Sequence, residues 1–248
     1  DTVRVFTRML DNVVEINGLP LEEQRNELIT KRRHGMGFTG LGSTLSMLNV
    51  KYGDDESIEF TNTVMKTMAV TGFKEGVNLA KEKGCAPLLT SQENRQKWVD
   101  GEYMKRIWGV WPEGALEVLE HGCRFTHHTS IAPTGTICLS LGNNCSNGIE
   151  PTFSHKYTRN VIKAGKKTKD AVDVYSYEML LYKHITGEDE VLESFSTSDT
   201  VTTKEQVDIQ AAAQYWCDSS ISKTISVATE MPYEDFKGVY LYAYEKGL

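Results

Sequence analysis

The stretch of this sequence best suited to bind an anion is Pro-Thr-Gly-Thr-Ile, residues 133–137. Pro133 and Gly135 suit the second and fourth positions of a type I turn, and the apolar run that follows can open a short helix. The backbone N–H groups of Gly135, Thr136 and Ile137 would then have no acceptor inside that helix. Such amides, at the positive end of a helix dipole, bind phosphate-sized anions, and the hydroxyls of Thr134 and Thr136 can add donors. We therefore predict a phosphate site here; a capped turn without a ligand is the alternative.

A second glycine-containing stretch, Gly-Met-Gly-Phe-Thr-Gly, matches the spacing G-x-G-x-x-G through Gly35, Gly37 and Gly40. In dinucleotide-binding folds these glycines let the backbone approach a pyrophosphate, but the motif must follow an apolar strand. The preceding residues, Ile-Thr-Lys-Arg-Arg-His, do not form one. The favoured interpretation is a tight strand-to-helix junction in which glycine permits close packing. A nicotinamide-dependent oxidoreductase that uses this loop stays open as an alternative.

The histidines and cysteines do not have the spacing of a metal site. His127 and His128 are adjacent on a predicted strand, so their side chains would point to opposite faces. The other four of the six histidines lie at no ligand spacing with a cysteine or carboxylate. The five cysteines contain no C-x-x-C pair, and the default interpretation of Cys138 and Cys145 is that of small buried apolar side chains. We predict no metal ligand in this chain.

Composition excludes several classes of protein. A net charge of −7 and a pI of about 5.5 leave no general basic surface for a nucleic acid. No run of about 18 apolar residues is present, so no transmembrane helix is expected. An odd number of cysteines in a chain of 248 residues favours a reducing compartment, and we expect a cytoplasmic location.

Hydrophobic periodicity predicts the elements that position these residues. Helices are predicted over 2–16, over the stretch Leu-Glu-Glu-Gln-Arg-Asn-Glu-Leu-Ile, from Asp54 or Asp55 to Gly84, and over 173–185, 204–218 and 233–248. Strands are predicted over 123–132, 152–163 and 219–227, and an exposed basic turn over 164–170. No repeat or linker interrupts the chain. The pattern indicates one α/β domain over 1–248, and the first helix reads as if it were entered midway, as in a segment of a longer protein.

Three stretches in this order resemble the large catalytic subunit of ribonucleotide reductase: KRRHGMGFTGLG (31–42), IAPTGTICLSLGNNCSNGIEPTFSHKYTRNV (131–161) and WCDSSISKTISV (216–227). The likeness covers essentially the whole chain, and the combination of Pro-Thr-Gly-Thr with Asn-Gly-Ile-Glu-Pro is its most specific part. It implies a ten-stranded α/β barrel made of two half-barrels, of which this chain would supply the second half. It also implies that Pro133, Thr134, Gly135, Thr136 and Ile137 hold the phosphate groups of a ribonucleoside di- or triphosphate. The neighbouring residues 146–151 would support that site.

The activity that the resemblance implies is the radical-based reduction of ribonucleotides to 2′-deoxyribonucleotides for DNA synthesis. In that family a thiyl radical abstracts the 3′-hydrogen, a carboxylate assists the loss of water, and a cysteine pair supplies the electrons. The chain departs from this pattern, because the Asn-x-Cys-x-Glu motif of the radical cysteine is absent and none of the five cysteines matches a catalytic position. We therefore expect no catalytic residue in this chain and activity only with an upstream half of the catalytic subunit.

The stretches Ala-Pro-Thr-Gly-Thr-Ile and Ser-Ile-Ser-Lys-Thr-Ile are most similar to the adenosylcobalamin-dependent class of the family. This likeness implies adenosylcobalamin as the cofactor and a thioredoxin-type protein as the reductant. No nucleic-acid or membrane partner is expected. A non-catalytic nucleotide-binding fragment is the remaining alternative from another functional class.

Overall fold

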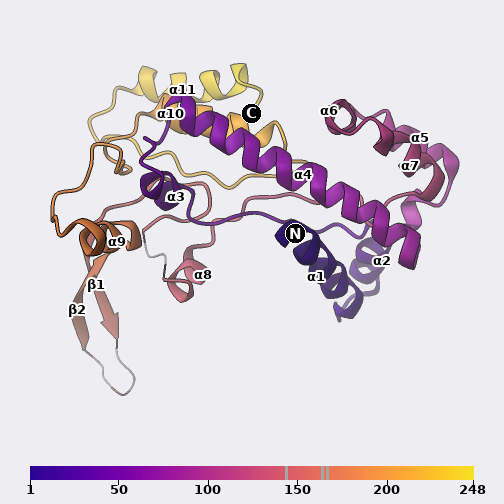
Figure 1. Cartoon of the computed structure of the whole chain (residues 1–248), viewed down its shortest axis with the longest axis horizontal. Helices are drawn as coiled ribbons and strands as arrows, with labels where there is room; N and C mark the ends of the chain where they lie inside the picture. Colours follow the sequence, from indigo (N-terminus) through magenta and orange to yellow (C-terminus); the bar gives the residue numbers. More distant parts are fainter. Residues whose placement is uncertain (143–144, 163–164, 166–167) are drawn as a thin grey trace. The chain divides into compact units, whose positions relative to one another are not determined.

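The computed structural model describes residues 1–142, 145–162, 165 and 168–248, and most of its regular structure is helical (Figure 1). The residues divide into two compact units. The first unit consists of residues 1–37, 62–130 and 214–220, and the second of residues 38–61, 131–213 and 221–248. That the chain folds as a single domain stays a prediction.

The first unit is built from helices around an aromatic core. Its elements are α1 (Thr2–Ile16), α2 (Glu22–Lys31), most of α4 (Asp55–Lys83), the 3-10 turn η1 (Pro87–Leu89), α5 (Gln92–Val99), α6 (Glu102–Val110) and α7 (Glu113–His121). Phe73 and Phe125 are almost fully buried, with ring centroids 5.9 Å apart. The apolar positions at three- and four-residue steps in the sequence thus correctly predicted α1 and α4.

The ends of α4 lie where the sequence predicts them. The Asp54 carboxylate accepts a hydrogen bond from the Ser57 N–H at 2.8 Å, which caps the first turn. At the other end Gly84 has a φ of +86° and its N–H donates to the Ala80 carbonyl at 2.9 Å. This left-handed position ends the helix and favours glycine.

Two histidines, one buried and one half-buried, lie together in the first unit. His128 is fully buried and stacks on Phe125 at 5.1 Å, and His34 lies edge-on to His128 at 5.1 Å. Burial lowers the pKa of His34 to about 4 and, aided by the nearby His34, the pKa of His128 to about 3. Both imidazoles are therefore neutral in the folded protein at neutral pH.

We expect these two histidines to make the fold sensitive to mild acid. The unfolded chain binds a proton at each histidine near pH 6.5, whereas the folded chain does so only near the lowered values. Stability from this source is thus complete above pH 6.5 and falls by about 1.4 kcal/mol per pH unit for each histidine as the pH drops below it. Urea unfolding between pH 7 and pH 5 should show this slope, and His128→Phe should remove about half of it. An unchanged slope in His128→Phe, or an equal loss in the exposed control His184→Phe, would contradict the assignment.

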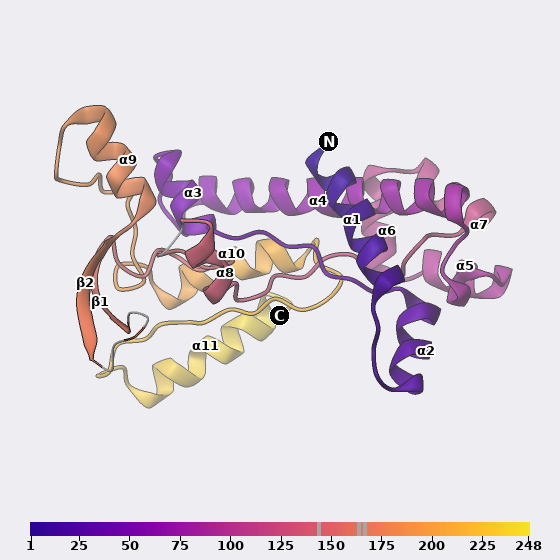
Figure 2. The ribbon, with the colours of Figure 1, turned by 90° about the horizontal axis from the view of Figure 1, so that it is seen from below.

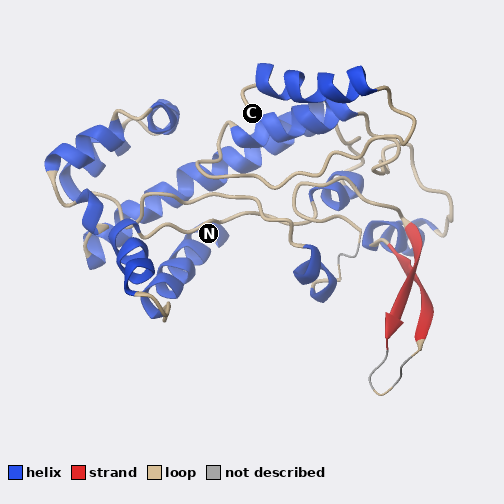
Figure 3. Ribbon diagram, turned by 180° about the vertical axis from the view of Figure 1, so that it is seen from behind, coloured by secondary structure: helices blue, strands red, loops and turns tan. Residues whose placement is uncertain are grey.

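The second unit combines short helices with one antiparallel hairpin. Its elements are α3 (Leu41–Met47), α8 (Gly135–Ser140), β1 (Lys156–Ile162), β2 (Lys169–Tyr175), α9 (Tyr177–Thr186), α10 (Thr203–Gln214, of which Gln214 falls in the first unit) and α11 (Tyr233–Glu245). The hairpin pairs Lys156 with Tyr175 at one end and Ile162 with Lys169 at the other (Figure 3). Helices α10 and α11 lie side by side in two views (Figures 1 and 2), and the Tyr242 hydroxyl donates to Asp208 at 2.8 Å between them.

Two of the predicted strands do not form. Residues 123–132 and 219–227 pair only through isolated parallel bridges, Met36 with Thr129 and Ile131 with Ile221. One physical reason is visible at His128 and Thr129, whose N–H groups donate to the Asp218 carboxylate at 2.8 Å each instead of to a neighbouring strand. The described residues thus show a mixed α/β chain with one two-stranded sheet, and the half-barrel stays a prediction.

The prediction of a helix over 173–185 is wrong at its start, because β2 continues to Tyr175. The helix begins only after Ser176, whose side chain accepts a hydrogen bond from the Met179 N–H at 3.3 Å. The predicted strand over 152–163 is confirmed for β1. Part of the predicted basic turn over 164–170 lies outside the described residues. A search of the described helices found none with both the length and the apolar character needed to span a bilayer.

Candidate functional site

The segment 133–137 leads directly into α8, as the sequence indicates, but Thr134 does not have the conformation of the predicted type I turn. Thr134 occupies the position before the helix with φ 54° and ψ 16°, in the left-handed region. Its carbonyl accepts the first hydrogen bond of the helix, from the Cys138 N–H at 2.9 Å. A β-branched residue is rarely found in this conformation, which costs on the order of 1–3 kcal/mol. The surrounding contacts must therefore hold Thr134 in place.

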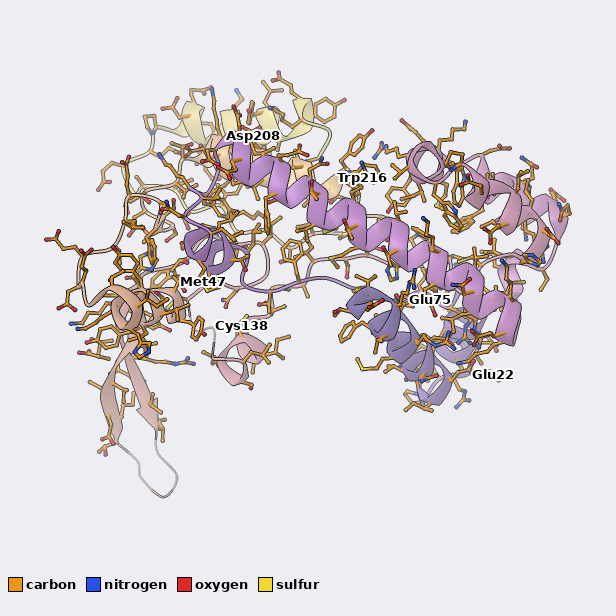
Figure 4. The ribbon with its side chains drawn as sticks, in the orientation of Figure 1. Glu22, Met47, Glu75, Cys138, Asp208 and Trp216 are labelled. Atoms are coloured by element: carbon orange, nitrogen blue, oxygen red, sulfur yellow. The ribbon has the colours of Figure 1, made fainter. Side chains whose placement is uncertain are left out.

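Three groups from elsewhere in the second unit hold the Thr134 side chain. The Gly148 N–H donates to Thr134 Oγ1 at 2.8 Å, and the Thr39 hydroxyl lies 2.9 Å from the same oxygen. The Cys138 thiol, on the first turns of α8 (Figure 4), lies 3.2 Å from it. The Thr134 hydroxyl is thus engaged within the protein, in contrast to the expectation that it would face the anion. Thr136 is exposed, so its hydroxyl is free to face an anion.

The backbone N–H groups of the first turn of α8 have no acceptor within the part of the chain that the structure describes. This holds for Gly135, Thr136 and Ile137, all three of which are exposed. A Cβ atom built on Gly135 would meet nothing closer than the Asn147 amide nitrogen at 3.8 Å. Unpaired N–H groups at a helix N-terminus with open space before them can receive an anionic oxygen.

The absence of a side chain at Gly135 is not required by the fold. Its φ lies outside the left-handed region, and the 3.8 Å contact is an ordinary van der Waals distance. Gly148 differs, because its φ is +50° and a Cβ there would lie 2.6 Å from the Ala132 carbonyl oxygen. The packing of the chain therefore explains why residue 148 is glycine. It does not explain why residue 135 is glycine.

Residues 146–151 brace the turn, as expected. Besides the bond from the Gly148 N–H, this segment accepts two hydrogen bonds. The Leu41 N–H donates to the Gly148 carbonyl at 3.1 Å, and the Tyr52 hydroxyl donates to the Ile149 carbonyl at 2.7 Å. A pocket of about 150 Å³ lies beside it, lined by polar side chains that include Asn147, Glu150 and Thr224. Asn147, one of the residues lining this pocket, is also the nearest neighbour of a Cβ built on Gly135.

The glycine stretch at residues 35–40 is not a dinucleotide loop. The element before it is a helix, α2, which ends at Lys31, so the strand that the motif requires is missing. Gly40, with a φ of +76°, directly precedes α3. Sequence reasoning overlooked Thr39, which lies within this stretch and contacts Thr134. The signal was available, because both stretches combine glycine with threonine next to a predicted helix start.

Cys138 and Cys145 are buried, as the sequence predicts. No group of three His, Cys, Asp or Glu side chains that could hold a metal ion occurs among the described residues. His155 is buried, with its ring nitrogens 2.9 Å from the Ser176 hydroxyl and 3.0 Å from the Phe195 carbonyl. All five cysteines are free, and burial raises the pKa of Cys145 to about 12. A thiol that stays protonated is a poor nucleophile.

Comparisons with known proteins identify the family of the chain. The family model described as "Ribonucleotide reductase, barrel domain" matches residues 1–248. The chain is 28% identical to the vitamin B12-dependent ribonucleoside-diphosphate reductase of Thermoplasma acidophilum over 260 residues, covering 98% of this chain and 31% of that protein. It is 24% identical to the ribonucleoside-diphosphate reductase subunit alpha of Chlamydia pneumoniae, covering all of this chain and 26% of that protein. It is also 24% identical to the ribonucleoside-diphosphate reductase large subunit of Caenorhabditis elegans, covering all of this chain and 34% of that protein.

The chain thus spans about a third or less of the length of these relatives. The family match nevertheless extends over every residue of the chain, including the turn at 133–137 and the segment that braces it. The chain belongs to the ribonucleotide reductase barrel-domain family.

Proposed function

We propose that this chain forms part of a ribonucleotide reductase, an enzyme that reduces ribonucleotides to 2′-deoxyribonucleotides, and that residues 133–137 bind the phosphate groups of the substrate. The observation that carries the proposal is the set of unshared N–H groups on Gly135, Thr136 and Ile137, exposed at the start of α8. The family match and the names of the relatives supply the reaction.

The proposed role of this chain in the reaction is binding and orientation. The three amides would donate to phosphate oxygens, and Thr136 would add a hydroxyl. Pro133 starts the turn and Thr134 fixes its conformation through Gly148 and Thr39. Holding the charged tail of the substrate in one place would fix the ribose relative to the radical-bearing residues, which lowers the entropic part of the barrier.

The remaining chemistry would come from an upstream part of the catalytic subunit. The Asn-x-Cys-x-Glu motif of the radical cysteine is absent from this sequence. An exposed apolar stripe on α1 supports a docking surface for that part: Val5, Met9, Val13 and Ile16 follow one another at three- and four-residue steps and are 68%, 47%, 46% and 83% exposed. A thioredoxin-type protein is the proposed reductant.

The proposal of adenosylcobalamin as cofactor is supported by the names of relatives, since those from Thermoplasma acidophilum and Mycobacterium tuberculosis are called vitamin B12-dependent. Other relatives carry no such term in their names. We assign no step of the reaction on this chain to the cofactor.

A reduction assay tests the proposed function. The chain should form no deoxyribonucleotide from ribonucleoside di- or triphosphates with a dithiol reductant and adenosylcobalamin. The same chain joined to an upstream segment that carries an Asn-x-Cys-x-Glu motif should form it. Turnover by the chain alone would contradict the requirement for a second part. Phosphate binding at 133–137 with no turnover in the joined protein would favour the non-catalytic nucleotide-binding module instead.

A further inference from the structure

A buried lysine lies at the far end of the contacts that support the phosphate turn. The Lys223 side chain is 1% exposed, and its ammonium donates to Glu150 Oε2 at 2.6 Å and to Gln206 Oε1 at 3.0 Å. A third hydrogen bond goes to the Thr224 carbonyl. All three N–H donors of the ammonium are therefore used within the second unit.

Glu150 is held at both of its carboxylate oxygens. Oε2 receives the Lys223 ammonium, and Oε1 accepts the Thr224 N–H at 2.6 Å. Charge-assisted bonds of this kind are about twice as strong as neutral ones. Residues 223–224 thus fix the position of Glu150, the acidic residue of the Ser-Asn-Gly-Ile-Glu-Pro stretch.

A short loop connects Glu150 to the turn. The Ser146 hydroxyl donates to the Glu150 carbonyl at 3.0 Å, and the Glu150 N–H donates to the Asn147 carbonyl at 2.8 Å. These bonds close residues 146–150 into a compact loop. From the tip of this loop the Gly148 N–H donates to Thr134 Oγ1 at 2.8 Å.

The contact between Gly148 and Thr134 has consequences for the anion site. Thr134 stays in the left-handed region only while its side chain is held, because that conformation is unfavourable for a β-branched residue. If Thr134 relaxes, the peptide planes that aim the Gly135 and Thr136 N–H groups rotate with it. The aim of the amides thus depends on the position of the 146–150 loop.

We infer that Lys223 is a positioning residue for the phosphate turn: through Glu150 and the 146–150 loop it holds Thr134 in the conformation that presents the free amides. This inference rests on the proposed function of residues 133–137. Burial lowers the pKa of Lys223 below its ordinary value, and the Glu150 carboxylate offsets only part of this effect. Apolar residues of similar volume often stabilise a fold as well as a buried ion pair does, so stability alone gives little reason to keep the pair.

The inference is tested with Lys223→Met in the 248-residue chain. The control is Lys246→Met, which removes the ion pair between Lys246 and Asp208 on α10, with an N–O distance of 2.7 Å. Among the described residues, this pair makes no contact with the turn. We expect Lys223→Met to weaken the binding of inorganic pyrophosphate by about tenfold or more, as for the loss of one charge-assisted hydrogen bond. Hydrogen exchange at the Gly148 amide should accelerate by a similar factor, and the control should change neither quantity.

A double variant separates positioning from stability. In Lys223→Met with Glu150→Gln no charge is left unpaired, so the thermal midpoint should recover toward the wild-type value. If Lys223 positions the turn, the weak pyrophosphate binding and the fast Gly148 exchange persist in this double variant. Recovery of all three quantities together would overturn the inference.

The outcome also distinguishes this inference from the proposed function. If the wild-type chain binds no pyrophosphate, the phosphate site is wrong, and the positioning of the loop is then judged from Gly148 exchange alone. If the wild-type chain binds pyrophosphate and Lys223→Met binds it equally well, the phosphate site stands and the role of Lys223 is refuted.

Discussion

Replacement of Gly135 by valine is expected to abolish phosphate binding while leaving the fold intact. A branched side chain would occupy the space in front of the N–H groups of Thr136 and Ile137, where the phosphate oxygens are proposed to lie. Loss of two hydrogen bonds to a charged group corresponds to roughly 3 kcal/mol or more, or about a hundredfold in affinity. Isothermal titration with pyrophosphate measures this change. The fold should tolerate the substitution, because the nearest neighbour of a Cβ at this position is 3.8 Å away.

A matched control for this substitution is Gly109→Val. Gly109 also lies in a short helix, α6, is exposed, and has no neighbour within 4 Å of a built Cβ. Neither variant should lose helix propensity, because valine is a slightly better helix former than glycine. Only Gly135→Val should lose pyrophosphate binding. Equal affinities in the two variants would show that the anion site is misplaced.

The second large effect is expected from Asp11→Ala in the first unit. The Asp11 side chain is 2% exposed, and its carboxylate receives the Arg32 guanidinium at 2.6 Å, Arg124 Nε at 2.9 Å and the Lys83 ammonium at 3.1 Å. Its removal leaves two nearly buried guanidinium groups with only the half-exposed Glu15 as a shared carboxylate partner. Breaking a buried ionic network in this way costs about 3–5 kcal/mol of unfolding free energy, which urea denaturation can measure.

The control for Asp11→Ala is Glu27→Ala, which removes exposed ion pairs with Lys31, at 2.6 Å, and with Arg33. This change should cost no more than about 1 kcal/mol, because exposed ion pairs contribute little. A loss in Asp11→Ala no larger than that in Glu27→Ala would contradict the account of the network.

The ionisation of Asp11 gives the same network a pH dependence. Burial opposes the charged form, but hydrogen bonds from Arg32 and Lys83 and the charges of Arg32 and Arg124 outweigh it and lower the pKa of Asp11 below its ordinary value. The contribution of Asp11 to stability is therefore present above its unfolded-state pKa of about 3.9 and is lost as the pH falls through the lower folded value. The histidine effect occurs at higher pH, so the two can be observed separately.

The helices were the most predictable part of the fold because their signals are local. The apolar steps of α1 and α11, the Asp54 cap of α4 and the left-handed Gly84 all depend on residues a few positions apart. The strands over 123–132 and 219–227 failed because a strand depends on its partner. Asp218, about 90 residues from His128 in sequence, accepts hydrogen bonds from N–H groups that would otherwise pair with a neighbouring strand. No local pattern reports such a contact.

The site was predictable to a similar extent. The helix start and the free amides at Gly135 to Ile137 follow from residue types within a single stretch, and the supporting segment follows from the family resemblance. The left-handed conformation of Thr134 could not be predicted in this way, because it depends on a contact with Thr39, 95 residues away in sequence. Likewise, the ion pair of Lys223 with Glu150 connects two motifs separated by 73 residues. The sequence indicates both motifs but cannot show that they touch.

We propose that the amides of Gly135, Thr136 and Ile137 receive the phosphate groups of a nucleotide. The most direct measurement is an NMR titration of the ¹⁵N-labelled chain with inorganic pyrophosphate and then with a ribonucleoside diphosphate. We predict saturable downfield shifts of these three amide protons, with the same three responding to both ligands. An absence of shifts at these amides, or saturable shifts confined to other positions, would contradict the claim.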